Sequence, residues 1–578
     1  MKAKCLFLAA IFFLIFLSCA GQKKNYQVSS IPRELQDNSK AVIRFYNRTF
    51  TVESADKASL EVEAAITVMN DNGLDLTDIK IFYDKFSKVR DITAKVYDKT
   101  GRLVKRVKKS DIRDYCATSP GTLYDDIRVE VIKPEYKNTP YTLEFSYRKK
   151  FDGLLHYPTW FPHQDYNVAV EESSFRIATP QSFEIRYLEK NLDAPSEIFD
   201  ADEQKIYSWK VKNLPSVVHE AYSNHYTEYL PCVLTAPNKF EIDDYKGNAE
   251  SWKSFGQWIY LLNKDRNNLP FETQDKIRDM VSGTDDKPEK IKILYKYMQD
   301  KTRYISIQDG IKGWQPFDAS VVDEVSYGDC KALSNYMKAL LEVACIKSYY
   351  TVVKSGYAPP PVRKNFPSNQ FDHVILYIPM EKDTVWLECT NPHQPFNYLG
   401  SFTDNRNALM ITDTGGVLIK TPKYKHFKNT NAVFEMDANS SKATLEFRFK
   451  GLFYDQHSVL IQKSYDDQKK FVQKFLDLPG SKLNKFLFTE NKNFQPEITL
   501  DVELGINNHV TALGSRLIFP VNILNKSAYI PVDNDERKSD IFIRRTYVKT
   551  DTVIYNIPEE YIFFLMLEKQ ARSTPFAY

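Results

Sequence analysis

The cysteine at position 330 lies where a thiol could act as a nucleophile. The residues Tyr327-Gly328-Asp329-Cys330-Lys331-Ala332 lead into apolar side chains at helical spacing, namely Leu333, Met337, Leu340, Leu341 and Ala344. This spacing predicts an amphipathic helix that begins at or near Cys330. The unpaired amides and the dipole at a helix N-terminus favour an anion, and would therefore stabilise a thiolate. A lone cysteine is more often a small core residue, so the hypothesis depends on its partners.

Two later segments carry a histidine and a carboxylate that could assist this thiol. Strand patterns cover 372–378 and 384–390, and the residues 379–383 between them are typical of a hairpin turn. In such a hairpin, His373 and Glu388 should lie opposite or nearly so on one face of the sheet. Glu388 would fix the imidazole tautomer, and His373 would take the thiol proton and return it to a leaving amine. Alone, His373 is typical of a satisfied strand histidine and Glu388 of a solvated charge; together with the cysteine they favour catalysis.

Three stretches resemble the Cys-His-acid core of the transglutaminase-like superfamily. They are Gly328-Asp329-Cys330-Lys331, Phe371-Asp372-His373-Val374 and Trp386-Leu387-Glu388-Cys389-Thr390. Tyr304-Ile305-Ser306-Ile307 and Gly313-Trp314-Gln315-Pro316 resemble the segment before the cysteine. More widely, the chain resembles bacterial envelope proteins in which an N-terminal β-sandwich of unknown function precedes that core and a C-terminal β-rich domain follows it. The N-terminal likeness rests on Gly121-Thr122-Leu123-Tyr124 and Tyr157-Pro158-Thr159-Trp160-Phe161-Pro162.

The resemblance implies roles for particular residues. Cys330 would be the nucleophile and His373 the base of a papain-like core, and Glu388 would take the third role, where the superfamily usually has aspartate. Acyl transfer through a thiol also needs donors for an oxyanion, one of which can be the backbone amide of Cys330. Trp314 and Gln315 each carry a side-chain N–H that could be the second, although both could equally be core or turn residues.

The length and periodicity of the chain predict a multidomain α+β protein. A chain of 578 residues is too long for one core. Alternating patterns predict an antiparallel β-sandwich over 41–245, helical patterns lead into a transglutaminase-like core over 246–405, and alternation returns in a β-rich domain over 425–578. A helix-compatible segment near 462–478 interrupts that last domain. In the resembled architecture this domain continues further. An incomplete C-terminal domain is therefore one of the alternatives that the sequence leaves open.

The first residues are typical of an export signal. Lys2 and Lys4 precede an apolar run over 6–17, and Ser18-Cys19-Ala20 ends it with small residues. Cleavage after Ala20 would release a soluble protein, whereas lipidation of Cys19 would anchor it, with residues 21–40 as a tether. We favour the lipoprotein, and expect it in the periplasm or at the outer membrane of a Gram-negative bacterium.

Charge and cysteine content exclude some classes of partner. Lys and Arg number 78 and Asp and Glu 75, and their interspersion gives no broad basic patch, so we expect no nucleic-acid binding. No Cys-x-x-Cys occurs, and no histidines cluster with cysteines at zinc spacing, so we expect no metal and no cofactor. Export would permit a disulfide between Cys116 and Cys232, whose proximity the sequence leaves open.

Two functions remain open at this point. The first is an exported thiol enzyme that cleaves amide or peptide bonds through a thioester, with hydrolysis favoured over transamidation. Its substrate would be a protein or peptide, a cell-wall peptide included. The alternative is a catalytically inactive binding or scaffold protein of the envelope, which the glutamate at position 388 and the large flanking domains favour.

Overall fold

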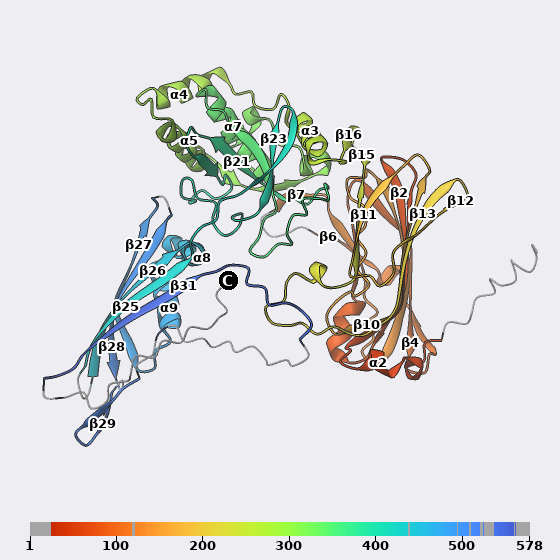
Figure 1. Ribbon diagram of the computed structural model, residues 1–578, viewed down its shortest axis with the longest axis horizontal. Helices are drawn as coiled ribbons and strands as arrows, with labels where there is room; N and C mark the ends of the chain where they lie inside the picture. The colour runs from red at the N-terminus through yellow and green to blue at the C-terminus, as the bar shows by residue number, and fades with distance from the viewer. Residues whose placement is uncertain are drawn as a thin grey trace, which may run out of the picture.

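The computed structural model describes residues 25–117, 122–436, 440–493, 495–507, 510–520, 524, 537–559 and 561. The chain forms a multidomain α+β protein with a β-rich domain at each end, as predicted (Figure 1). The predicted signal segment with Cys19 lies outside the described residues. No helix in the described part of the chain is long and apolar enough to cross a membrane.

The N-terminal domain is built on one eight-stranded sheet (Figure 1). Its strands, in spatial order, are β12 (Glu197–Ala201), β13 (Gln204–Leu214), β10 (Val168–Pro180), β1 (Ala41–Val52), β2 (Lys57–Val68), β9 (Tyr141–Asp152), β4 (Ser87–Asp98) and β5 (Leu103–Arg106). The pair β1–β10 is parallel, so the prediction of a purely antiparallel sandwich is wrong at this pair. The register of this pair depends on contacts between segments more than a hundred residues apart, which alternation within each strand does not encode.

Smaller sheets complete the core of this domain. They are β11 (Ile185–Lys190) with β14 (Cys232–Pro237), and β3 (Ile79–Tyr83), β8 (Arg128–Ile132) and β6 (Arg113–Cys116). Residues of both small sheets pack into the same apolar cluster as the large sheet, around Phe50, Trp160, Phe175 and Trp209. This arrangement buries the alternating apolar face that the sequence shows.

Residues 25–40, part of the predicted tether, are instead packed on the sheet. They form the 3-10 turn η1 (Val28–Ser30) and the short helix α2 (Arg33–Gln36). Ile31 and Leu35 are buried against Val42 and Ala169. The apolar side chains of this stretch therefore belong to the domain, and the expectation of a free tether is wrong for these residues.

The central domain combines a five-stranded antiparallel sheet with five helices. The strand order is β22 (Thr384–Leu387), β21 (His373–Pro379), β20 (Tyr349–Val353), β23 (Asn407–Thr412) and β24 (Gly415–Lys420). Four helices share one apolar cluster with β21 and β22, namely α4 (Phe271–Val281), α5 (Lys287–Lys301), α6 (Ala319–Val325) and α7 (Cys330–Val343). Helix α3 (Trp252–Asn263) packs in a second cluster with β20, β21 and β23. It passes β24 so closely that a Cβ on Gly256 would lie 2.2 Å from the backbone of Gly416, which requires glycine there.

The N-terminal and central domains are joined by more than the chain itself. Strand β7 (Thr122–Asp125) pairs in parallel with β18 (Ser306–Gln308) of the central domain. The hairpin of β15 (Lys239–Ile242) and β16 (Tyr245–Asn248) places Phe240 against Phe255 and Trp258 of α3. Within the central domain, just before α7, β17 (Arg303–Tyr304) pairs with β19 (Tyr327–Gly328). The β7–β18 pair and the packing of Phe240 on α3 hold the N-terminal domain against the central domain.

The C-terminal domain is a five-stranded sheet with helices on one side (Figure 1). Its strands, in spatial order, are β27 (Ser481–Asn491), β28 (Glu497–Asn507), β26 (Ser440–Lys450), β25 (Phe427–Glu435) and β31 (Val548–Asn556). A separate pair, β29 (Thr511–Leu513) with β30 (Arg516–Ile518), lies between β28 and β31 in the sequence. Helix α9 (Tyr465–Leu476) occupies the region predicted to interrupt the strands, and helix α8 (Leu452–Ser458) precedes that region. Before β31, the chain returns to the other domains, where Arg537 donates to the Ala221 carbonyl and Arg545 pairs with Asp404.

Candidate active site

Cys330 is the first residue of helix α7. Its predecessor Asp329 caps the helix, because Oδ1 accepts from the backbone N–H of Ala332 at 2.9 Å. The other oxygen, Oδ2, pairs with the buried ammonium of Lys331. The first-turn amides of a helix have no partner within the helix, so the backbone N–H of Cys330 is placed to meet an anion. The Cys330 side chain is buried, with 7% of the residue exposed.

His373 opens β21, and Glu388 follows directly after the end of β22. The His373 Nε2 donates to Glu388 Oε2 over 2.8 Å, and both side chains are buried. The hairpin register is shifted by two residues from the predicted one: Leu376 pairs with Leu387, and Tyr377 pairs with Trp386. His373 and Glu388 are therefore diagonal neighbours rather than directly opposed. A shift of two keeps both side chains on one face, because strand side chains alternate.

Hydrogen bonds hold both the carboxylate and the backbone carbonyl of Glu388. Its Oε1 accepts from the backbone N–H of Thr390 at 3.1 Å and from the Thr390 hydroxyl at 2.6 Å. The Tyr295 hydroxyl on α5 donates to the Glu388 carbonyl at 2.6 Å. The sequence analysis did not assign a role to Thr390. A hydroxyl two residues after an acidic residue is the local signal that could have indicated it.

Electrostatics in this pair favour a charged imidazole. Burial lowers the pKa of His373, but the charge of Glu388 and hydrogen bonds to Cys330 and Glu388 outweigh it and raise this pKa well above 6.5. Burial likewise raises the pKa of Glu388, but the charge of His373 and the hydrogen bonds from His373 and Thr390 lower it overall. Because Nε2 binds Glu388, Nδ1 is the ring nitrogen left to exchange a proton with the neighbouring Cys330 thiol. The thiol therefore lies beside a histidine that a buried carboxylate orients.

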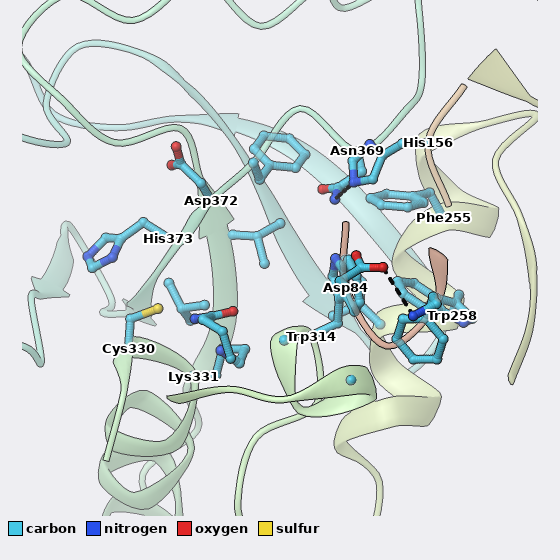
Figure 2. A pocket seen from close by; sticks show the side chains of 18 of the residues that line it. Asp84, His156, Phe255, Trp258, Trp314, Cys330, Lys331, Asn369, Asp372 and His373 are labelled. Carbon is cyan, nitrogen blue, oxygen red and sulfur yellow. Dashed lines mark hydrogen bonds between the residues drawn. The ribbon is translucent and has the colours of Figure 1, made fainter. Parts of the chain in front are cut away.

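Cys330 and His373 lie at one end of a cavity of about 500 Å³ (Figure 2). The central domain supplies aromatic and apolar walls from α3, from the 3-10 turn η5 (Gly310–Gly313) and its flanks, and from β20 and β21. The N-terminal domain supplies the remaining wall, which the sequence analysis did not anticipate. Its lining residues are Asp84, Phe86, Asp126, Ile127 and His156.

The two oxyanion candidates occupy different environments. Trp314 lines the cavity, further along it than Cys330 and His373 (Figure 2). Gln315 is buried, and its Nε2 donates to the Tyr245 hydroxyl at 3.2 Å; it is not among the residues that line this cavity. Trp314 therefore lies on the wall of the cavity that Cys330 lines, whereas the side-chain amide of Gln315 is bound to Tyr245 outside that lining.

The other described cysteines are free thiols. Cys116 is exposed and Cys232 is buried, and no disulfide joins them. Cys389 is buried behind Glu388, and burial raises its pKa. Cys345 is exposed, with a φ of +59° just beyond the end of α7.

Comparisons with known proteins give one family match and one clear likeness of fold. Residues 55–218 match DUF3857, described as a domain of unknown function with a solved structure. A crystal structure named a "putative protease" from Parabacteroides distasonis has a TM-score of 0.53 at 12% identity, covering 81% of this chain and 94% of that one. A "putative cysteine protease" from Cytophaga hutchinsonii has a TM-score of 0.19 at 9% identity, over 64% of this chain and 87% of that one, which is too low to support an argument.

The curated proteins contain no match to the chain. At 12% identity, the likeness to the Parabacteroides structure shows a shared fold and leaves the activity open. Residues 55–218, within the N-terminal domain, are therefore similar to DUF3857, and the chain shares its fold with a solved protein named as a protease.

Proposed function

We propose that this protein is a thiol enzyme of the transglutaminase-like superfamily, which cleaves an amide or peptide bond through a thioester on Cys330. The observation that carries the proposal is the Cys330 thiol beside the hydrogen-bonded His373–Glu388 pair, at the end of an open cavity. The likeness of fold to a protein named as a protease supports it.

The first half-reaction would form the thioester. The Cys330 thiolate attacks the carbonyl carbon, and the negative charge that develops on the oxygen is met by the backbone N–H of Cys330 at the start of α7. Trp314, on the wall of the same cavity, is our candidate for a second donor. His373 then gives its Nδ1 proton to the departing nitrogen, which leaves as an amine while the acyl group stays on sulfur.

The second half-reaction would return the free enzyme. His373, now neutral, takes a proton from a water molecule while the oxygen of that water attacks the thioester carbon. The bond from carbon to sulfur then breaks, which releases the carboxylic acid and restores the Cys330 thiolate. Glu388 keeps the imidazole oriented in both halves through its bond to Nε2. An amine in place of water would give transamidation by the same steps. We favour hydrolysis, since a solvated envelope supplies water at far higher concentration than any amine.

The proposal extends to location and partners. We propose an exported protein that Cys19 anchors by a lipid in the periplasm or at the outer membrane, and that acts on a protein or peptide, a cell-wall peptide included. Replacing Cys19 by alanine should move the protein from the membrane fraction to the soluble fraction. An unchanged distribution would remove the lipid anchor from the account.

Peptide mixtures provide the direct test of activity. The full-length mature protein is incubated with a cell-wall digest and with a protein digest in H₂¹⁸O, with the Cys330→Ala variant as the matched control. Hydrolysis predicts new products that carry one ¹⁸O and are absent from the control. A tagged primary amine in a parallel sample detects transamidation. Products that are the same in both proteins, or no products in any mixture, would favour the binding or scaffold protein.

A further inference from the structure

The wall of the catalytic cavity that faces the thiol is acidic. Asp84 and Asp126, both from the N-terminal domain, line the cavity together with Cys330. Figure 2 shows Asp84 across the cavity from the thiol. These carboxylates have no part in the proposed bond cleavage, so their position at the cavity needs another explanation.

Local hydrogen bonds fix both carboxylates in place. Asp84 Oδ1 accepts from the backbone N–H of Phe86 at 3.0 Å and from the Ser87 hydroxyl at 2.6 Å. Asp126 Oδ2 accepts from the backbone N–H of Lys85 and of Gly310, each at 3.2 Å. Because these donors are neutral, they orient the two carboxylates without neutralising their charge.

Neither carboxylate forms an ion pair within the residues that the structure describes. Lys149 lies near enough to influence Asp84, but its Nζ donates to the Phe82 carbonyl at 2.8 Å. Lys85 is exposed, and its Nζ lies beside Gly310 and the ring of Phe86. The wall formed by Asp84 and Asp126 therefore presents negative charge that no described side chain pairs with directly.

The other charged groups of the cavity are already paired or neutral. Lys331 pairs with Asp329, and Asp372 pairs with Lys354 at 2.5 Å. The Asn369 Nδ2 donates to His156 Nε2 at 3.1 Å, which makes this nitrogen an acceptor in a neutral ring. A net negative charge thus remains on the Asp84–Asp126 wall.

Aromatic rings line the same cavity. They are Phe86, Phe255, Trp258, Trp314, Tyr350 and Phe371. Phe255 and Trp258 lie on the side of Asp84 away from the thiol (Figure 2). Such rings pack well against the methylene groups of a long side chain, and their faces attract a cation. A cavity that combines aromatic walls with carboxylates matches a long side chain that is apolar along its stem and positive at its tip.

We propose that the substrate carries a long cationic side chain, ammonium or guanidinium, next to the scissile carbonyl, and that Asp84 and Asp126 of the DUF3857-containing domain select it. This inference rests on the proposed function, because it takes Cys330 as the site of attack. It gives the N-terminal domain a direct part in specificity. Asp84 and Asp126 contact the side chain of the substrate and not its reacting atoms.

The test measures how well small ligands protect Cys330 from iodoacetamide. The ligands are Nα-acetyl-lysine methylamide and its uncharged analogue Nα-acetyl-norleucine methylamide. Mass spectrometry follows the Cys330 peptide, and the exposed thiol of Cys345 serves as the internal reference in each sample. We expect half-protection by the lysine ligand at about 10-fold lower concentration, the factor that corresponds to one charge-assisted hydrogen bond.

The variant for this test is the double change Asp84→Asn with Asp126→Asn. Asparagine keeps an oxygen that can accept the same backbone and hydroxyl hydrogen bonds, so the wall keeps its shape and loses its charge. The lysine preference should disappear while the unprotected alkylation rate stays the same. Asp125→Asn is the matched control, since Asp125 accepts from the backbone N–H of Ile127 and is not among the lining residues.

Equal protection by the two ligands, or a preference that survives in the double variant, would overturn the proposal. Failure of the proposed enzymatic function would look different. Protection needs only a thiol at the end of the cavity, so at pH 9 the preference can be measured even if Cys330 has ordinary reactivity and no turnover is found.

Discussion

Two buried histidine–carboxylate pairs in this protein have opposite electrostatics. His373 and Glu388 are 2.8 Å apart beside the cavity that Cys330 lines, and the pKa of His373 is raised. His426 Nε2 and Asp404 Oδ2 are 3.9 Å apart at the junction with the C-terminal domain. At this junction, burial and the positive charges of Arg545 and Lys423 lower the pKa of His426. The charge of Asp404 raises this pKa, but not enough to reverse the shift.

The difference lies in what else each carboxylate contacts. Asp404 pairs with Arg545 and lies 3.9 Å from Arg406, so two guanidinium groups already compensate its charge. Glu388 has only neutral donors besides His373, namely the amide and hydroxyl of Thr390. Its charge therefore acts on the imidazole. A histidine beside a buried carboxylate becomes a candidate base only when no arginine competes for that carboxylate.

The largest expected effect comes from neutralising the two carboxylates separately. Glu388→Gln should lower turnover about 100-fold, because the imidazole loses both its orientation and its charge partner. Asp404→Asn should leave turnover intact but lower stability by about 3 kcal/mol, because it leaves buried guanidinium charge unpaired. Turnover of a substrate found in the peptide mixtures and urea unfolding would measure the two effects. The reverse pattern would show that Asp404, not Glu388, supports the reaction.

The pH dependence of stability should separate the two histidines. A raised pKa in the fold means that the contribution of His373 is full below pH 6.5 and is lost as pH rises through its folded pKa. The lowered pKa of Glu388 adds stability that is lost only as pH falls through its folded value, below 4.5. His426, with a lowered pKa, instead costs stability as pH falls below 6.5.

As the pH falls from 9 to 5.5, the destabilisation caused by His373→Asn should therefore increase. The destabilisation caused by His426→Asn should decrease over the same change of pH. Urea unfolding of the two variants and the parent at several pH values measures both trends. Parallel trends in the two variants would contradict the assignment of opposite charge states.

A smaller effect is expected from the hydroxyl that orients Glu388. Thr390→Val keeps the shape of the side chain and the backbone donor, but removes the hydroxyl that donates to Oε1. We expect turnover to fall about 5-fold, as the loss of one neutral hydrogen bond suggests, and Thr390→Ser to restore it. Equal losses in the valine and serine variants would point to packing rather than to this hydrogen bond.

Local patterns predicted the main elements of the fold. Helical spacing after Cys330 predicts the helix that the structure shows as α7, and strand alternation indicates β21 and β22. The two-residue shift in the hairpin was not predictable, because several turn lengths fit the residues between the strands. The acidic wall of Asp84 and Asp126 depends on how two domains pack, and neither residue has a local pattern that indicates the cavity. The engagement of Gln315 by Tyr245 depends on packing in the same way.

The central claim is that His373 activates the Cys330 thiol, and the pH dependence of Cys330 alkylation tests it most directly. Iodoacetamide rates at Cys330 are measured by mass spectrometry from pH 5 to pH 9 in the mature protein and in His373→Ala, with His426→Ala as the control. Cys345, exposed and remote from His373 in the chain, supplies the reference thiol. We predict that Cys330 reacts well below pH 8 in the parent and in His426→Ala, and loses this reactivity in His373→Ala. A Cys330 profile that follows Cys345 in all three proteins would contradict the account.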